Sequence, residues 1–263
     1  MILNLKSRTK IGDYINTSII IAKELEPILK PLYQEMISSV KCLPGKKDTF
    51  AVQWGENYPI SKKEGIIFVG RATNQWHTTE EDIDILFGNP DRGSTIFNCE
   101  DQMRWVYECW DGKDYATKRS AFWRVIRAVS KFFYPNDELS HVAWSNVCKI
   151  QMDNGKNPVG KIFDYQIEIC KKIFKAEIDV LSPRFVVMFI GDYGKKEMLS
   201  YMNHGTMPKV EYSKRWDGYE THVYIIDEVY YICTEHPMGK NESEHIKCLL
   251  FLINKYKSEC MDM

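Results

Sequence analysis

Four short hydrophobic runs, each followed by a polar loop, organise the chain. They span residues 65–70, 141–147, 185–190 and 230–233. Apolar runs of this length, closed by glycine or polar residues, are typical of strands buried on both faces of a parallel sheet. A further run at 222–226 lies just before the last strand, and Asp227 and Glu228 between them predict a tight hairpin.

Apolar residues at helical spacing separate these strands. They predict helices at 98–110, 119–133, 161–181, 195–202 and 242–256. Pro135 and Pro183 end the second and third of them. An N-terminal helical segment at 13–40 contains Pro27 and Pro31, which we expect to break or bend it.

The alternation of strands and helices predicts an α/β fold. We expect a three-layer αβα sandwich around a central, mostly parallel four-stranded sheet. Residues 1–60 form an N-terminal helical segment packed on the core in this prediction, and residues 61–263 form the α/β domain, in a single globular unit. Ligands bind beyond the carboxyl ends of parallel strands, so the loops at 71–77, 146–158, 192–193 and 234–241 predict the site.

The overall charge gives little support to nucleic-acid binding. The formal net charge is −1 and the sequence pI is about 6.6, whereas phosphate contacts leave a basic footprint. A local footprint is available at 113–131, where six lysines and arginines are opposed only by Asp114 and the preceding Asp111, although an acidic stretch at 80–101 comes before it. The alternative interpretation is two solvated helix faces of opposite charge.

The cysteines indicate neither a metal site nor a disulfide framework, because the eight are scattered without a CxxC pair. We therefore expect reduced, mostly buried thiols and no metal or other cofactor. The short apolar run at 19–22 is too brief for a membrane span or a signal peptide, which predicts a cytoplasmic protein that does not enter a membrane.

Several motifs occur in a recognisable order. They are WSNVCKI from Trp144, GKNP from Gly155, Cys170, EIDVLSP from Glu177 leading into VVMFIG, and EHP from Glu235. Together they resemble the uracil-DNA glycosylase superfamily, in its iron-sulfur and mismatch-specific branches. SAFWRVIRAVS from Ser120 is similar to a helix of the mismatch-specific branch, so the resemblance covers about residues 65–256.

The resemblance implies hydrolysis of an N-glycosidic bond after a nucleotide is flipped out of the helix. It implies that Asn146 reads the base edge and that His236 stabilises the negative charge developing on the base. An Asn amide offers a donor and an acceptor to a pyrimidine, and an imidazole can hydrogen-bond an anionic leaving group. Each residue also has a structural alternative, a turn-stabilising Asn and a buried, hydrogen-bonded His.

The first loop departs from the family pattern. Family members carry GEAPG-like or GQDPY sequences there, but this chain has GRATNQW from Gly70, with no carboxylate at the expected place. Asn74 is the candidate to orient the water. Asp192 also follows a strand, although it suits a helix N-cap better. The four cluster cysteines of the iron-sulfur branch are absent apart from Cys170, so no cluster is expected.

Other residues are candidates to contact the substrate. Trp76 and Phe97, and with them Phe87, are aromatic residues that can stack on a flipped base or lie in the core. Met238 occupies the place of a residue that wedges into the DNA stack, or it fills a gap in the core. Lys149, Lys240 and Asn241 are candidate phosphate contacts.

The sequence therefore predicts a monomeric DNA glycosylase that acts on uracil or another modified or mismatched base in single- or double-stranded DNA. Two alternatives remain open. One is a non-catalytic module of the same fold that binds a nucleobase, a nucleotide or nucleic acid. The other is a hydrolase of a small nucleoside or nucleotide.

Overall fold

A computed structural model describes residues 17–59, 64–73, 83–87, 101–113, 115–152 and 155–258. Within these ranges the helices are α1 Thr17–Val40, α2 Ile83–Phe87, α3 Arg104–Glu108, α4 Ala121–Phe133, α5 Lys161–Leu181, α6 Lys195–Met202 and α7 Glu242–Ser258. A 3-10 turn, Thr117–Arg119, leads into α4. The strands are β1 Lys47–Thr49, β2 Gln53–Trp54, β3 Gly65–Gly70, β4 Val142–Asn146, β5 Ile150–Met152, β6 Pro183–Phe189, β7 Tyr212–Trp216, β8 Tyr219–Ile226 and β9 Val229–Thr234.

A mixed sheet forms the centre of the molecule. In the described part of the chain it has seven strands in the order β2-β4-β3-β6-β9-β8-β7. The four central strands β4, β3, β6 and β9 are parallel, as predicted. The prediction of a four-stranded sheet is wrong in extent, because β2 adds antiparallel to one edge and the β8–β7 pair extends the other. The predicted hairpin is confirmed as β8 and β9.

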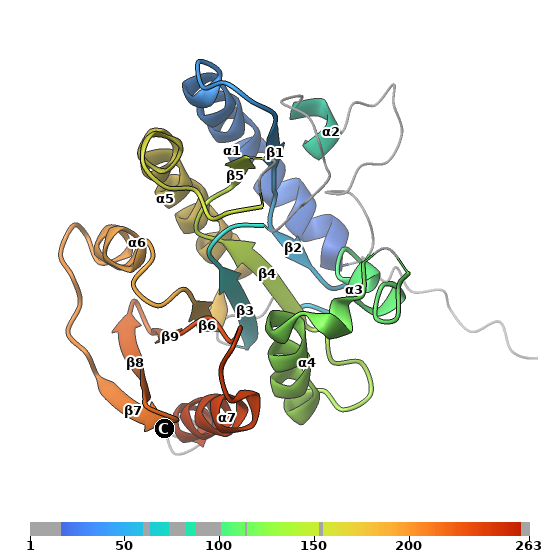
Figure 1. Cartoon of the computed structure of the whole chain (residues 1–263), viewed down its shortest axis with the longest axis vertical. Coiled ribbons are helices and arrows are strands. Elements are labelled where there is room, and N and C mark those ends of the chain that lie inside the picture. Colours follow the sequence, from blue (N-terminus) through green and yellow to red (C-terminus); the bar gives the residue numbers. More distant parts are fainter. Residues whose placement is uncertain are drawn as a thin grey trace, which may run out of the picture.

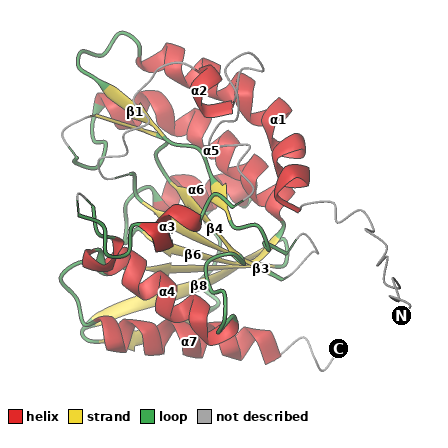
Figure 2. Cartoon of the chain, turned by 90° about the vertical axis from the view of Figure 1, so that its right-hand side faces the viewer, coloured by secondary structure: helices red, strands yellow, loops and turns green. Residues whose placement is uncertain are grey.

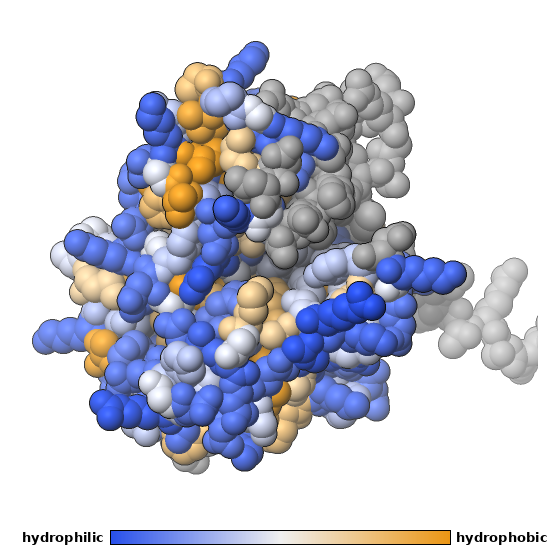
Figure 3. Space-filling view, in the orientation of Figure 1, coloured by the Kyte–Doolittle hydropathy of each residue, from blue (hydrophilic) through white to orange (hydrophobic). Residues whose placement is uncertain are grey.

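Helices cover both faces of this sheet (Figures 1 and 2). Alternate residues of β3 belong to two different hydrophobic clusters, because successive side chains of a strand point to opposite faces. Ile67 and Val69 pack with residues of α1, α5 and α6, whereas Ile66 and Phe68 pack with residues of α4 and α7. The outer surface in the view of Figure 3 is mostly hydrophilic, which fits a sandwich with its apolar side chains between the layers.

The N-terminal part of the chain joins this unit directly. Helix α1 packs along α5, and β2 pairs with β4 at the edge of the main sheet. The expected break at Pro27 and Pro31 is absent, since α1 is continuous through both. Both prolines lie on the exposed side of the helix, where water can hydrogen-bond the carbonyl groups that lack an N–H partner.

Candidate functional site

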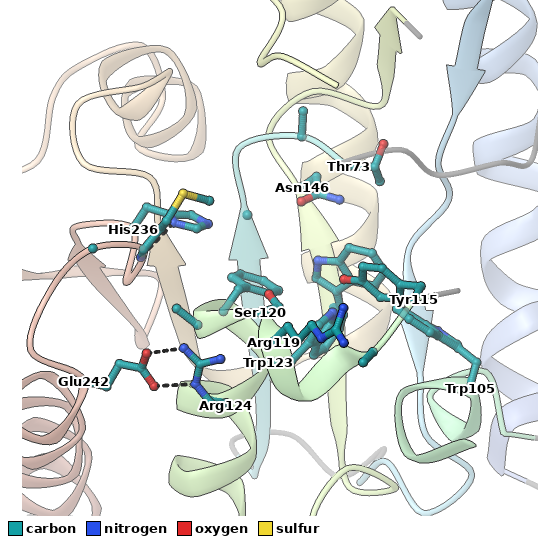
Figure 4. Close-up of a pocket in the computed structure, with 18 residues that line it drawn as sticks. Thr73, Trp105, Tyr115, Arg119, Ser120, Trp123, Arg124, Asn146, His236 and Glu242 are labelled. Atoms are coloured by element: carbon teal, nitrogen blue, oxygen red, sulfur yellow. Dashed lines mark hydrogen bonds and ion pairs between the residues drawn. The ribbon is translucent and has the colours of Figure 1, made fainter. Parts of the chain in front are cut away.

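A cavity of about 730 Å³ opens at the carboxyl end of the parallel strands (Figure 4). Gly70 ends β3 and Asn146 ends β4 at one wall. Residues 119–124, which span the end of the 3-10 turn and the start of α4, form the opposite wall. Residues 236, 238 and 239 after β9 close one side. Three of the four predicted loops therefore contribute to one site. The loop at 192–193 does not line it.

Asn146 presents a buried amide at the cavity wall. Its residue is 1% exposed, and its Nδ2 makes no hydrogen bond to any described residue. Its Oδ1 lies against Gly70, where a Cβ atom would come within 2.4 Å of that oxygen. A buried donor without an acceptor costs about 1–3 kcal/mol. The unused N–H donor is therefore suited to a ligand that supplies a carbonyl oxygen.

His236 lies at the side of the same cavity, where its ring is parallel to that of Phe122 with centroids 5.9 Å apart. Its Nδ1 accepts the backbone N–H of Met238 at 3.2 Å, so the neutral ring carries its proton on Nε2. Burial, together with the smaller effect of the nearby positive charges of Arg71 and Lys240, lowers the pKa of His236 to about 4. At neutral pH the histidine is therefore an uncharged Nε2–H donor.

Aromatic side chains form the cavity floor. Trp144 lies 4.9 Å from Trp123 and 6.3 Å from Phe122, measured between ring centroids. Trp105 packs edge-on against Trp123 at 5.3 Å, and Tyr115 is 48% exposed at the rim. This floor was not predicted as part of the site, although Phe122, Trp123 and Trp144 stand in the two motifs that carried the family resemblance.

Ion pairs neutralise much of the predicted basic footprint at 113–131. Lys118 pairs with Asp111, Arg124 with Glu242 and Arg127 with Glu138. Arg124 also donates from Nη1 to the carbonyl oxygen of Lys118 at 2.6 Å. Among the described residues that line the cavity, Arg119 is the cation without a carboxylate partner, and it is exposed.

The structure corrects the prediction for Lys149. Its side chain is completely buried and its Nζ lies 2.7 Å from Glu177 Oε1, so it cannot reach a phosphate on the surface. A lysine after a strand is usually solvated, but here α5 covers it. Phe87 is also in the core, 5.2 Å from the Tyr33 ring, and does not line the cavity.

The remaining candidates are distributed around the site. Met238 is 69% exposed at the cavity mouth. Lys240 lies 4.5 Å above the Tyr219 ring and 3.9 Å from Glu235, and Asn241 accepts the backbone N–H of Glu244 at the start of α7. Asp192 has a 94% exposed side chain paired with Lys195. Asn74, Trp76 and Phe97 lie outside the described residues.

In the described ranges, no three His, Cys, Asp or Glu side chains gather as a metal site requires. None of the helices described there is both long enough and apolar enough to cross a lipid bilayer. Comparison of the chain with models of known protein families and with curated proteins gives no match.

Proposed function

We propose that the protein is a DNA glycosylase that releases uracil or another modified or mismatched base after flipping it into this cavity. One observation carries the proposal. The unused buried amide donor of Asn146 and the neutral Nε2–H donor of His236 line the same aromatic cavity. Two fixed donors above an aromatic floor suit a flat ligand with carbonyl oxygens, which describes a uracil-like base.

Each group has a defined part in this reaction. The base stacks on the aromatic floor, and Asn146 donates from Nδ2 to a base carbonyl oxygen. As the bond between the base nitrogen and C1′ breaks, its electron pair leaves with the base, and His236 donates from Nε2 to the oxygen that gains charge. A preorganised donor to a developing anion contributes more in a water-excluded site than in bulk water. Water then adds to C1′ of the sugar and releases a proton.

The DNA partner would meet the rim of the cavity. Exposed Met238 stands at the mouth, and Arg119 is a cation without a carboxylate partner among the described residues. An exposed apolar side chain can occupy the space left in the base stack, and an arginine can contact a backbone phosphate.

A second function has its own supporting observation. The carboxylate among the described lining residues is Glu242, and Arg124 holds it through two guanidinium nitrogens. Without a free carboxylate to orient water, the same cavity would suit binding of a base or nucleotide without cleavage. The Asn74 position, outside the described residues, is the alternative source of a water-orienting group.

A single-turnover assay tests the proposal. Single- and double-stranded oligonucleotides containing uracil, hypoxanthine or a T·G mismatch are incubated with excess protein, and alkali reveals abasic sites. We expect His236→Ala to slow cleavage by roughly 10²–10³-fold, the effect of losing one donor to a developing anion. His222→Ala is the matched control, since His222 bonds to Ser213 on β7 outside the cavity.

Absence of abasic product from folded wild-type protein would contradict the glycosylase proposal. Calorimetric titration with free bases and nucleotides would then test the binding function, with Asn146→Ala expected to abolish the affinity. Equal cleavage rates for wild type and His236→Ala would remove His236 from the mechanism.

A further inference from the structure

A fully buried polar trio lies directly beside Asn146. Lys149 donates from Nζ to Ser145 Oγ at 2.7 Å and to both carboxylate oxygens of Glu177 at 2.7 and 2.9 Å. Ser145 donates from Oγ to Glu177 Oε2 at 2.6 Å. The three residues are at most 1% exposed. Lys149 and Ser145 flank the end of β4, and Glu177 comes from α5.

Stability alone explains this trio poorly. Removing an ammonium and a carboxylate from water costs several kcal/mol for each ion, and the attraction between them often only offsets that cost. Apolar side chains of similar volume frequently give an equally stable fold at such positions. A buried ion pair instead fixes the relative position of the elements that carry it. Any other position would leave a buried charge without its partners.

The trio fixes the chain on both sides of Asn146. Ser145 precedes it, and the side chain of Lys149 folds back over four residues to the same hydroxyl. The backbone between them is held by hydrogen bonds from Val147 to Gly70 and from Cys148 to Arg71, both 2.9 Å. Ser145 and Asn146 are consecutive strand residues, so their side chains point to opposite faces, toward α5 and toward the cavity respectively.

The geometry points to Lys149, Glu177 and Ser145 as positioning residues for Asn146. They hold the end of β4 in one place relative to α5 and thereby set the position of the Asn146 amide before a ligand binds. Fixing a recognition group in advance removes the cost of ordering it on binding and sharpens discrimination between ligands. The link to base selectivity rests on the proposed function, whereas the positioning of the amide does not.

The double variant Lys149→Met/Glu177→Met tests this inference, because it removes both charges together. We expect the variant to fold, but the side-chain amide NMR signals of Asn146 to shift and broaden in the absence of ligand. The signals are assigned by their loss in Asn146→Asp. In the single-turnover assay, the ratio of rates on the best and second-best base should fall at least about tenfold, by about 1.4 kcal/mol of discrimination.

Arg127→Met/Glu138→Met is the matched control. This ion pair joins α4 to the following loop, and neither residue lines the cavity. Removal of the ion pair should therefore leave the Asn146 signals and the rate ratio unchanged. If the Lys149 and Glu177 variant does not fold, Ser145→Ala keeps both charges and removes only the hydroxyl that joins them to β4. The same loss of Asn146 order is expected for it.

Unchanged Asn146 amide signals in the folded variant would overturn the inference and leave the trio a structural feature. A wild type without base cleavage or base binding, but with the expected change of the Asn146 signals between variants, would refute the proposed function while supporting the positioning role. The two failures are therefore distinguishable.

Discussion

At the scale of single residues, the position of the Asn146 amide depends on the absence of a side chain at Gly70. Gly70 lies opposite Asn146 in the parallel β3–β4 register, and a Cβ atom there would lie 2.4 Å from Asn146 Oδ1. That approach is far inside van der Waals contact, so any other residue must displace the amide. The glycine at the end of β3 thus leaves room for the Asn146 amide at the end of β4.

We predict that Gly70→Ala impairs the proposed base recognition more than it impairs folding. The added methyl group should cost about 1–3 kcal/mol of stability, as overpacking usually does, and it should move the Asn146 amide from its position. Single-turnover rates or base affinities should fall toward those of Asn146→Ala, while urea denaturation remains cooperative.

A double-mutant cycle tests whether Gly70→Ala acts through the Asn146 amide. If Gly70→Ala acts by displacing Asn146, adding it to Asn146→Ala should change the rate or the affinity very little. Independent, additive losses would instead show that the methyl group obstructs the ligand itself.

At the scale of elements, the sequence predicted those parts whose signal is local. Helices α5 and α6 have the predicted bounds, since apolar spacing and Pro183 define one of them and glycines precede both. The short strands β1, β2 and β5 and the edge strand β7 were not predicted. β7 has the sequence YSKRW with mostly exposed or half-buried side chains, a pattern that resembles a loop until a neighbouring strand pairs with it.

The candidate site likewise contains some residues that could be predicted from the sequence and others that could not. Asn146 and His236 could be predicted to share an end of the sheet because each follows a parallel strand. The aromatic floor could not, since it depends on how α4 packs across β4. Lys149 was assigned to the surface because its partner Glu177 is 28 residues away in the chain and becomes a neighbour only when α5 docks on the sheet.

We predict that Gln166→Leu is strongly destabilising. Gln166 on α5 accepts the backbone N–H groups of Lys149 and Ile150 at 3.1 and 2.9 Å and donates to the carbonyl oxygen of Ile150 at 2.8 Å. Leucine would leave these buried groups without partners, at about 1–3 kcal/mol for each group.

Urea denaturation measures this effect, and Gln34→Leu is the control. Gln34 is exposed on α1, so its replacement should change the free energy of unfolding by less than about 0.5 kcal/mol. Similar values for the two variants would mean that the loop after β4 finds other hydrogen-bond partners.

At the scale of the whole molecule, two uncharged histidines connect the site to the stability of the fold. His245 on α7 is fully buried, stacks on Trp216 at 4.0 Å and shares a 2.8 Å hydrogen bond with Thr234, the last residue of β9. Burial lowers its pKa to about 3, with a smaller effect from Lys240. The cavity and the contact of α7 with the sheet therefore both require a neutral imidazole.

These histidines predict a loss of stability as the solution becomes acidic. An unfolded histidine binds a proton with a pKa of about 6.5, whereas the folded values are about 4 for His236 and about 3 for His245. Between pH 6.5 and 4 the unfolded state thus binds more protons than the folded state. As the pH falls through this range, each histidine should reduce the free energy of unfolding by at most about 1.4 kcal/mol for each pH unit. None of this loss is expected above pH 7.

Urea denaturation at pH 7.5, 6.0 and 5.0 measures this slope, and variants apportion it. His245→Gln should reduce this pH dependence of the free energy of unfolding by nearly the contribution of one bound proton. His236→Gln should reduce it by a second, because glutamine cannot titrate. A slope that persists in the double variant would place the acid sensitivity elsewhere. Loss of about one proton with each variant separately would mean that the two histidines titrate independently.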